Sequence, residues 1–253
     1  MAAAPPRMAV VENYDPAMSF AGPAADTYDD APRGDEEAAV AFLAELAGRG
    51  PVLELAIGTG RIGLPLAARG IEVDGIDLSP DMIAKLRAKP GGDRLSVTMG
   101  DFADVAVPGT YRLIYVVFNT LFNLLTQDEQ VRCFGNVAEH LTDDGAFVVE
   151  AFVPTFLASL RDDRYVDAEH VGVDEVWLDV GRVDPVAQRL EKTHVRLTAG
   201  DVYLNPVVLR YAWPAEIDLM ARLAGLRLAE RWAGWGREPF TSTSGSHVSV
   251  YGR

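Results

Sequence analysis

Three glycines follow an apolar run at a spacing that suits a nucleotide-binding turn. Gly58, Gly60 and Gly63 fit the pattern G-x-G-x-x-G, directly after the run 52–57 and before a helical pattern. In that context the glycines permit a tight turn and let a ligand approach the bare backbone. Because many α/β folds carry a glycine-rich turn between a strand and a helix, this motif alone does not identify its ligand.

An acidic residue stands at the corresponding place after the next apolar run. Asp77 follows the segment 71–76, and Ser79 and Pro80 then open a helical pattern. The two oxygens of a carboxylate match the two adjacent hydroxyl donors of a ribose. An acid is also favoured at the start of a helix by the helix dipole. Asp77 therefore indicates a nucleoside ligand but does not choose between the cofactors that contain one.

The elements that must position these residues alternate between strands and helices. The predicted strands span 52–57, 71–76, 95–99, 113–118 and 146–153, and the helices between them span 62–68, 79–86 and 127–141. Such alternation implies parallel strands joined by right-handed crossovers. Near-continuous apolar strands are typical of a sheet covered on both faces, and ligands bind at the carboxyl ends of its strands. The sequence predicts an α/β fold with a doubly wound, mostly parallel, Rossmann-like sheet.

The second half of the chain has a different pattern. Segments 173–180, 188–197 and 202–212 alternate apolar with polar residues and are separated by turn signals, as in an antiparallel ribbon. A helix over 215–224 and strands over 226–232 and 247–251 close the chain. We therefore expect an N-terminal arm or lid at 1–33, an α/β core at 34–153, an antiparallel β insert at 154–213, and the closing helix and strands at 214–253.

Composition limits the partners of the protein. The chain has 253 residues, 49% of them hydrophobic and 24% charged, which is typical of a soluble globular protein. Its formal net charge is −14 and its basic residues are scattered, whereas nucleic-acid binders need a basic stripe. No apolar run approaches the roughly 20 residues that span a bilayer. With one cysteine, Cys133, and no secretory signal pattern, we expect a cytoplasmic protein with no nucleic-acid or membrane partner.

Three segments at the ends of successive predicted strands narrow the choice of cofactor. They are Glu-Leu-Ala-Ile-Gly-Thr-Gly-Arg at 54–61, Gly-Ile-Asp-Leu-Ser-Pro-Asp-Met at 75–82, and Gly-Asp-Phe at 100–102. In order and spacing, this part of the chain (28–153) resembles the class I S-adenosylmethionine (SAM)-dependent methyltransferases. The closing segments 210–214 and 224–226 are similar to the small-molecule branch of that family, which includes sugar N-methyltransferases of antibiotic pathways.

The resemblance implies SAM as the cofactor and S-adenosylhomocysteine as its product. It places the methionyl part near Glu54 and the glycine turn, the ribose hydroxyls on Asp77, and the adenine amino group on Asp101. The expected cofactor contacts are Glu54, Ala56, Gly58, Thr59, Gly60, Arg61, Asp77, Leu78, Met82, Asp101, Phe102 and Phe118. This set suits SAM, because its ammonium, sulfonium, amino and hydroxyl groups match carboxylates and other acceptors.

Methyl transfer from a sulfonium is an in-line displacement, in which positioning and exclusion of water can supply much of the acceleration. The sequence shows no nucleophile elbow, no HExxH motif and no cysteine–histidine metal cluster. It singles out no general base among its four histidines, His140, His170, His194 and His247. The resemblance places Asn119 beside the transferable methyl and Tyr28 in a lid over the cofactor, so these two are the expected catalytic residues.

Acceptor contacts are expected from Asn123, His170, Arg210, Tyr211 and Trp235. An arginine could donate a forked pair of hydrogen bonds to a phosphate or carboxylate, and a tryptophan could form an apolar wall. Each of these residues also has an ordinary structural alternative, as a solvated strand residue or as part of the core.

The sequence predicts a SAM-dependent methyltransferase (EC 2.1.1 class) whose acceptor is a natural-product or sugar-like small molecule. Two alternatives stay open: a SAM-fold protein without methyl transfer, and an NAD-dependent oxidoreductase built on the glycine turn. The second draws no support from the Gly-Asp-Phe segment. The methylated atom is not determined, because specificity lies in the insert. An exposed edge of that insert could pair with a second copy to form a homodimer.

Overall fold

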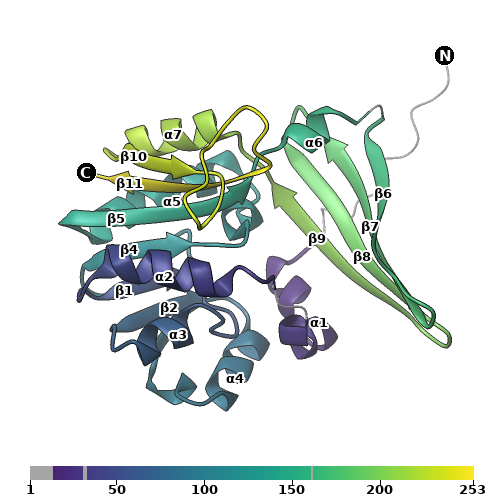
Figure 1. Ribbon diagram of the computed structural model, residues 1–253, viewed down its shortest axis with the longest axis horizontal. Helices are drawn as coiled ribbons and strands as arrows, with labels where there is room; N and C mark the ends of the chain where they lie inside the picture. Colours follow the sequence, from purple (N-terminus) through teal and green to yellow (C-terminus); the bar gives the residue numbers. More distant parts are fainter. Residues whose placement is uncertain (1–13, 31–32, 161) are drawn as a thin grey trace.

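Two β-sheets and a short N-terminal arm make up the protein. The computed structural model describes residues 14–30, 33–160 and 162–253. A seven-stranded sheet forms the core, and a four-stranded ribbon extends from one end of it (Figure 1). No helix within the described residues is both long enough and apolar enough to cross a membrane.

The core sheet has the strand order β10-β11-β5-β4-β1-β2-β3. Its strands are β1 (Val52–Leu55), β2 (Val73–Asp77), β3 (Ser96–Met99), β4 (Tyr111–Val116), β5 (Leu141–Phe152), β10 (Arg227–Trp232) and β11 (Ser246–Gly252). Strands β1 to β5 are parallel, whereas β11 pairs antiparallel with β5 and with β10. The predicted doubly wound, mostly parallel sheet is confirmed.

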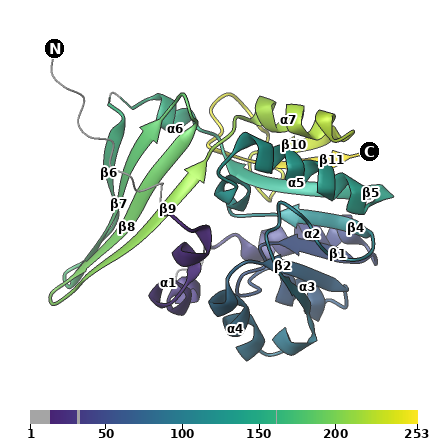
Figure 2. The ribbon, with the colours of Figure 1, turned by 180° about the vertical axis from the view of Figure 1, so that it is seen from behind.

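Helices cover both faces of this sheet. One face packs against α2 (Glu36–Ala47), α3 (Gly63–Ala68) and α4 (Pro80–Ala88), and the other against α5 (Gln127–His140) and α7 (Pro214–Leu223) (Figures 1 and 2). Along β4, Leu113 and Tyr115 pack on the face covered by α2, α3 and α4, and Ile114 and Val116 pack on the face covered by α5 and α7. Because successive residues of a strand bury on opposite faces, the strand has a continuous apolar sequence.

The ribbon is the predicted antiparallel insert. Its strands are β6 (Arg164–Val171), β7 (Glu175–Asp184), β8 (Arg189–Thr198) and β9 (Val202–Arg210), paired in that order. Strand β6 was not predicted, because nearly all of its residues are exposed and it lacks an apolar alternation. The pair Arg189–Arg210 lies at the core end of the ribbon, and the pair Leu197–Val202 lies near its tip.

The described part of the N-terminal arm forms short helices, η1 (Pro16–Phe20), α1 (Pro23–Asp26) and η2 (Tyr28–Asp30), where the sequence predicts irregular structure. The arm lies between the core and the ribbon (Figure 2). The Ser19 hydroxyl donates to the Pro206 carbonyl of β9 at 2.7 Å, and the Gly22 amide donates to Asp81 of α4 at 2.7 Å. Hydrogen bonds from the arm therefore reach both of the larger units.

Three further short elements complete the fold: η3 (Gly92–Arg94), η4 (Thr120–Asn123) and α6 (Thr155–Ala158). Of these, η4 follows β4 and contacts β9. This places the loop after β4 at the point where the core meets the ribbon.

Candidate functional site

The glycine turn after β1 is held against the end of β2. Gly58 has a φ of +56° and Gly60 a φ of +77°, which glycine adopts without strain. The Gly58 amide donates to Asp77 Oδ2 at 2.6 Å. A Cβ at Gly58 would lie 3.3 Å from the Met82 methyl, so a side chain there would crowd the turn.

Asp77 is fixed by two backbone donors. Its Oδ1 accepts from the Ser79 amide at 2.8 Å, and its Oδ2 accepts from Gly58. Burial raises the pKa of Asp77, and these backbone hydrogen bonds oppose the rise. Each carboxylate oxygen retains a further lone pair, so the group can still accept from a ligand. Ser79 caps α4 and Pro80 is its first residue, as the sequence predicts.

The first cavity has a volume of about 290 Å³ and opens at the ends of β1, β2 and β3. Its lining includes seven of the twelve predicted cofactor contacts: Ala56, Gly58, Asp77, Leu78, Met82, Asp101 and Phe102. Asp101 is oriented by the Ala103 amide, which donates to its Oδ1 at 2.8 Å. Two carboxylates beside an apolar wall of Leu78, Met82 and Phe102 suit an adenosine, whose sugar and amino groups donate and whose base is flat.

Glu54 lies behind the glycine turn and does not line this cavity. The side chain is fully buried beside Tyr115, and its Oε2 lies 2.8 Å from where a Cβ on Gly63 would stand. Burial raises the pKa of Glu54 to about 8; the charge of Asp77 adds to the rise, and Tyr115 and the Gly63 backbone oppose it. The carboxyl faces the first turn of α3, and the expected contact between Glu54 and the methionyl group stays a prediction.

Thr59 and Arg61 connect the glycine turn to the arm. The Thr59 hydroxyl donates to Asp29 at 2.7 Å, and Arg61 donates to the Tyr28 carbonyl at 2.6 Å. Arg61 also forms an ion pair with Glu36 at 3.3 Å. These two residues, like Gly60, do not line the first cavity, although all three were expected to touch the cofactor. The described contacts of Thr59 and Arg61 give them a role in holding the arm.

The loop after β4 begins with two residues of unusual backbone conformation. Phe118 and Asn119 have φ values of +58° and +64°, a strained region for residues with a side chain. The Phe118 amide donates to Glu150 Oε2 at 2.8 Å, and Asn119 Oδ1 accepts from the Phe152 amide at 2.6 Å. The end of β5 therefore holds this strained turn in place.

A second cavity, of about 1220 Å³, lies between the arm, this loop and the ribbon. Phe118 and Asn119 line it, so Phe118 borders the second cavity and not the first. Four residues line both cavities: Phe20, Tyr28, Thr120 and Asn123. The two cavities thus adjoin at a wall formed by the arm and by η4, which we call the junction.

Two polar groups at the junction have properties that matter for chemistry. Asn123 Oδ1 is buried and has no hydrogen-bond partner among the described residues. Burial raises the pKa of Tyr28, although the guanidinium groups of Arg33 and Arg61 oppose the rise, so its hydroxyl stays protonated near neutral pH. The junction therefore offers an unused acceptor and a neutral hydroxyl.

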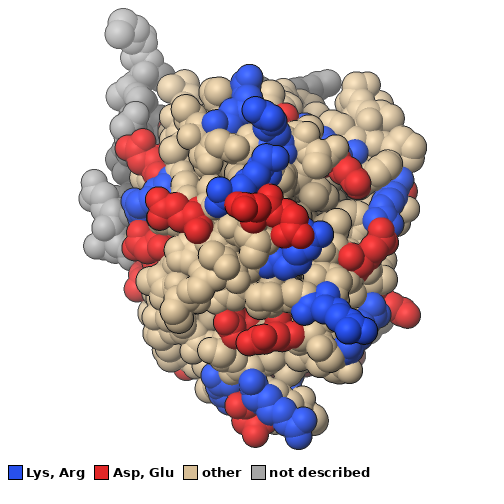
Figure 3. All heavy atoms as spheres, turned by 90° about the vertical axis from the view of Figure 1, so that its left-hand side faces the viewer, with Lys and Arg blue, Asp and Glu red and all other residues tan. Residues whose placement is uncertain are grey.

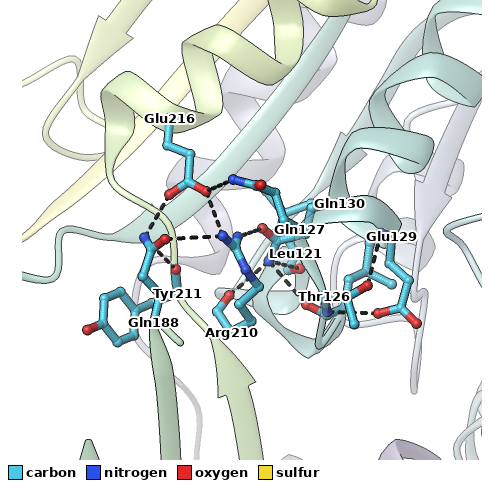
Figure 4. Close-up of polar contacts among 10 residues, drawn as sticks. Leu121, Thr126, Gln127, Glu129, Gln130, Gln188, Arg210, Tyr211 and Glu216 are labelled. Atoms are coloured by element: carbon cyan, nitrogen blue, oxygen red, sulfur yellow. Dashed lines mark hydrogen bonds and ion pairs between the residues drawn. The ribbon is translucent and has the colours of Figure 1, made fainter. Parts of the chain in front are cut away.

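Arg210 belongs to a buried polar network and lines neither cavity (Figure 4). Its guanidinium donates to Gln130 Oε1 at 2.5 Å and to Glu216 Oε1 at 2.6 Å, and its side chain is only 7% exposed. Gln188 donates to Glu216 Oε2 at 2.7 Å. The described contacts give Arg210 a role in joining β9 to α5 and α7, and its expected role in binding the acceptor stays a prediction that this geometry does not support.

Three other expected acceptor residues also lie outside both cavities. Tyr211 is buried in the core, and its amide donates to the Gln188 carbonyl. Trp235 is buried against Phe42 and donates to Glu150. His170 is exposed on β6 and contacts the Trp177 ring. Of the five residues expected to bind the acceptor, only Asn123 lines the second cavity.

Sequence reasoning missed several residues that line the cavities. At the cofactor end these are Pro16, Phe20, Ser79, Thr120, Leu124, Leu125 and Glu129. On the ribbon they include Glu169, Lys192, Arg196 and Asn205. Trp177, a candidate from the sequence for an apolar wall, lines the second cavity, as does His194. His194 was considered beside His170 as a residue that could face the acceptor. The alternation of β8 shows that Lys192, His194 and Arg196 share a face, but it does not show which face is inward.

Charges of both signs are interspersed on the face opposite the ribbon (Figure 3). A binding surface for nucleic acid would need a continuous basic stripe. The expectation that the partner is a small molecule is consistent with this face, and the absence of a nucleic-acid partner stays a prediction.

Comparisons with known proteins agree with this geometry. Residues 52–145 match the family described as "Methyltransferase domain". The chain is 27% identical over 204 residues to the cypemycin N-terminal methyltransferase of a Streptomyces species, covering 80% of this chain and 82% of the relative. It also resembles the SAM-bound structure of CalS10, an amino pentose methyltransferase from Micromonospora echinaspora, with 21% identity, a TM-score of 0.66, and coverage of 89% of this chain and 94% of that one.

A more similar structure is that of the CcbJ methyltransferase from Streptomyces caelestis. The two chains are 40% identical, with a TM-score of 0.89, and the match covers 94% of this chain and 99% of CcbJ. Identity at this level over nearly the whole chain, together with the cavity that the three motifs form, shows the family. This protein belongs to the class I SAM-dependent methyltransferases.

Proposed function

We propose that this methyltransferase transfers the methyl group of SAM to an amine nitrogen of a small natural-product or sugar-like acceptor. SAM occupies the first cavity and the acceptor occupies the second. The observation that carries this proposal is the junction, because four residues line both cavities and the methyl group can pass only where the two adjoin. The N-terminal arm and the β insert form the roof of the acceptor cavity.

Asn123 Oδ1, which has no hydrogen-bond partner among the described residues, favours nitrogen as the atom that receives the methyl group. An amine that donates one N–H to Asn123 Oδ1 has its lone pair directed elsewhere, toward the cofactor. The protonated Tyr28 hydroxyl can orient the amine but cannot act as a phenolate base. Two of the relatives, the N-terminal and the amino pentose methyltransferases, are named for acceptors that carry an amine.

When SAM is bound, its sulfonium supplies an activated methyl group, and the C–S bond electrons stay on sulfur as the C–N bond forms. The protein itself contributes position. Asn119 holds the loop after β4, Asn123 and Tyr28 hold the acceptor nitrogen, and the arm excludes water. The nitrogen must arrive without its extra proton, and the methylated ammonium releases a proton to water afterwards. The NAD-dependent alternative is wrong, because the chain belongs to a SAM-dependent family.

Paired variants separate the two cavities. We expect Asn123→Ala to lower kcat for amine acceptors about tenfold, the loss typical of one well-placed hydrogen bond, and to weaken SAM binding far less than the loss of Asp77 does, although Asn123 lines both cavities. Asp77→Asn should instead weaken SAM binding about tenfold or more, because its charge serves the ribose hydroxyls. Release of S-adenosylhomocysteine measures turnover, and calorimetry measures SAM binding.

The matched control is Asn136→Ala, since Asn136 lies on α5 outside both cavities and donates to the Ala103 carbonyl. Asn136→Ala should change neither kcat for amine acceptors nor the affinity for SAM by more than about twofold. The proposal fails if alcohols that lack an amine are methylated as well as the matching amines, or if Asn123→Ala turns over amines at the rate of the unmodified protein.

A further inference from the structure

The inner face of the ribbon carries a cluster of polar side chains that the methyl-transfer chemistry does not use. Glu169, Lys192 and His194 line the second cavity, and Asp179 lies beside them with a side chain that is 13% exposed. Asp179 and His194 face each other across the β7–β8 ladder. We call Glu169, Asp179, Lys192 and His194 the ribbon cluster.

Contacts within the ribbon cluster fix its geometry. Lys192 Nζ lies 2.9 Å from Asp179 Oδ2, and the Tyr165 hydroxyl donates to the same oxygen at 3.4 Å. His194 Nδ1 lies 3.4 Å from Glu169 Oε2. The side chains of His194 and Glu169 are about two-fifths exposed (37% and 38%), so a ligand in the cavity can reach them. The cluster is therefore ordered on the sheet side and accessible on the cavity side.

One atom of the cluster lacks a partner. Asp179 Oδ1 is buried and accepts no hydrogen bond from any described residue. A buried carboxylate oxygen without a donor costs free energy, so such atoms in folded proteins normally have a partner. Asp179 does not itself line the second cavity, so the groups that a ligand there can reach are those of Glu169, Lys192 and His194, and Asp179 holds Lys192 in position behind them.

A metal ion is a poor occupant for this position. Ligand atoms of Glu169, Asp179 and His194 do lie within 4.8 Å of one another. However, the Lys192 ammonium already provides the positive charge that balances Asp179, and it would repel a cation bound to the same carboxylate. The cluster instead combines acceptors, the carboxylates, with a donor, the ammonium. Hydroxyl groups suit this mixture, because each hydroxyl both donates and accepts.

We propose that the ribbon cluster binds adjacent hydroxyl groups of the acceptor, so that the substrate is an amine attached to a polyhydroxylated, sugar-like ring. This inference rests on the proposed function, since it takes the second cavity as the acceptor site. The amine lies at the junction and the hydroxyl groups lie against the ribbon. Specificity is thus set on the insert, away from the atoms that react.

Three probes built on a six-membered ring test this assignment. D-glucosamine carries the amine and the hydroxyl groups, cyclohexylamine carries only the amine, and methyl glucoside carries only the hydroxyl groups. We expect the unmodified protein to methylate D-glucosamine with a kcat/KM, calculated on the concentration of the unprotonated amine, about tenfold or more above that of cyclohexylamine. The variants Glu169→Gln and Lys192→Met should lose most of this preference, because they lower kcat/KM for D-glucosamine more than kcat/KM for cyclohexylamine, while their SAM affinity stays unchanged.

Glu191→Gln is the matched control. Glu191 lies on the same strand as Lys192 and His194 but on the opposite face, where it pairs with Arg182 at 2.8 Å. The preference of Glu191→Gln for D-glucosamine over cyclohexylamine should equal that of the unmodified protein. Thermal denaturation of each variant establishes that the ribbon is folded.

The outcomes separate the two proposals. If cyclohexylamine is methylated but D-glucosamine is no better, or if Glu169→Gln keeps the preference, the ribbon assignment is overturned and amine methylation stands. If methyl glucoside is methylated and depends on Glu169, nitrogen methylation is overturned and the ribbon assignment stands. If no probe is methylated, both fail. Stoichiometric zinc or manganese in the purified protein that Glu169→Gln abolishes would assign the cluster to a metal and overturn the proposal.

Discussion

Two acidic residues on neighbouring strands illustrate how side-chain direction decides a role. Asp77 points into the first cavity and is oriented by the amides of Gly58 and Ser79. Glu54 lies on β1, one strand away, and points behind the glycine turn toward Tyr115 and Gly63. The first carboxylate can serve a ligand, whereas the second is a buried acid whose effect is on stability.

Glu54 makes the stability of the protein depend on pH. Burial raises its pKa from 4.5 to about 8. Between those values the folded protein keeps a proton that the unfolded chain releases, so stability falls as pH rises through this window. Glu54→Gln lacks this proton. We therefore expect its stability relative to the unmodified protein to increase by up to about 1.4 kcal/mol per pH unit between pH 5 and 8, measured by urea unfolding without SAM.

The matched control for this measurement is Glu72→Gln, because Glu72 is exposed just before β2. Its free energy of unfolding should differ from that of the unmodified protein by the same amount at every pH. A difference for Glu54→Gln that is likewise independent of pH would contradict the raised pKa of Glu54.

At the scale of elements, the ribbon depends on the network around Arg210. This residue ends β9, and its partners come from α5, α7 and the segment before β8 (Figure 4). Gln130 returns a hydrogen bond to the Arg210 carbonyl at 2.8 Å. The network therefore connects the core end of the ribbon to two helices that pack on the core sheet.

Removing the guanidinium should destabilise this connection. Arg210→Met removes the cationic partner of Glu216 and the donor to Gln130 Oε1, and breaking one partner of a buried ion pair costs about 3–5 kcal/mol. We expect a loss of that size in urea unfolding, with KM for the acceptor raised more than the Kd for SAM. Arg227→Met, on the exposed side of β10, should change stability by less than about 0.5 kcal/mol. A similarly small effect for Arg210→Met would mean that the network does not hold the ribbon.

At the scale of the whole molecule, the arm closes both cavities through polar contacts. Asp29 accepts from the Thr59 hydroxyl at 2.7 Å and pairs with Lys89 at 2.7 Å, and Lys85 pairs with Asp26. Tyr28, the neighbour of Asp29, lines both cavities. Ion pairs of this exposed kind are individually weak and are screened by salt.

The arm should therefore open more readily when Asp29 is neutral. We expect Asp29→Asn to release SAM about three- to fivefold faster at low ionic strength, and the difference from the unmodified protein to shrink as salt rises toward 1 M. Stopped-flow displacement measures the rate. Asp93→Asn, an exposed residue of η3, serves as the control. Equal release rates for Asp29→Asn and the unmodified protein would show that these contacts do not retain the cofactor.

Much of the fold and of the cofactor end follows from local pattern. The five parallel strands, the glycine turn, Asp77, Asp101 and the cap of α4 lie where the sequence predicts them, because apolar runs, turns and caps are set by neighbouring residues. The strand ends differ: β1 ends at Leu55 and β4 at Val116, two residues before the predicted ends, and β5 begins at Leu141, five residues before its predicted start. The acceptor end was predicted far less well. Conformation at Asn123 depends on a turn held by β5, and the burial of Arg210 depends on helices distant in sequence.

The sequence by itself determined the order of the strands and helices in the core, the cofactor motifs and the family they indicate, because these depend on short-range periodicity and on the residue types that a nucleoside requires. Only the tertiary structure decided which face of the ribbon is inward, which acids and arginines are buried, and that two cavities meet at Phe20, Tyr28, Thr120 and Asn123. Those properties depend on how the ribbon and the arm pack against the core. Packing joins residues far apart in the chain, so no local pattern encodes it.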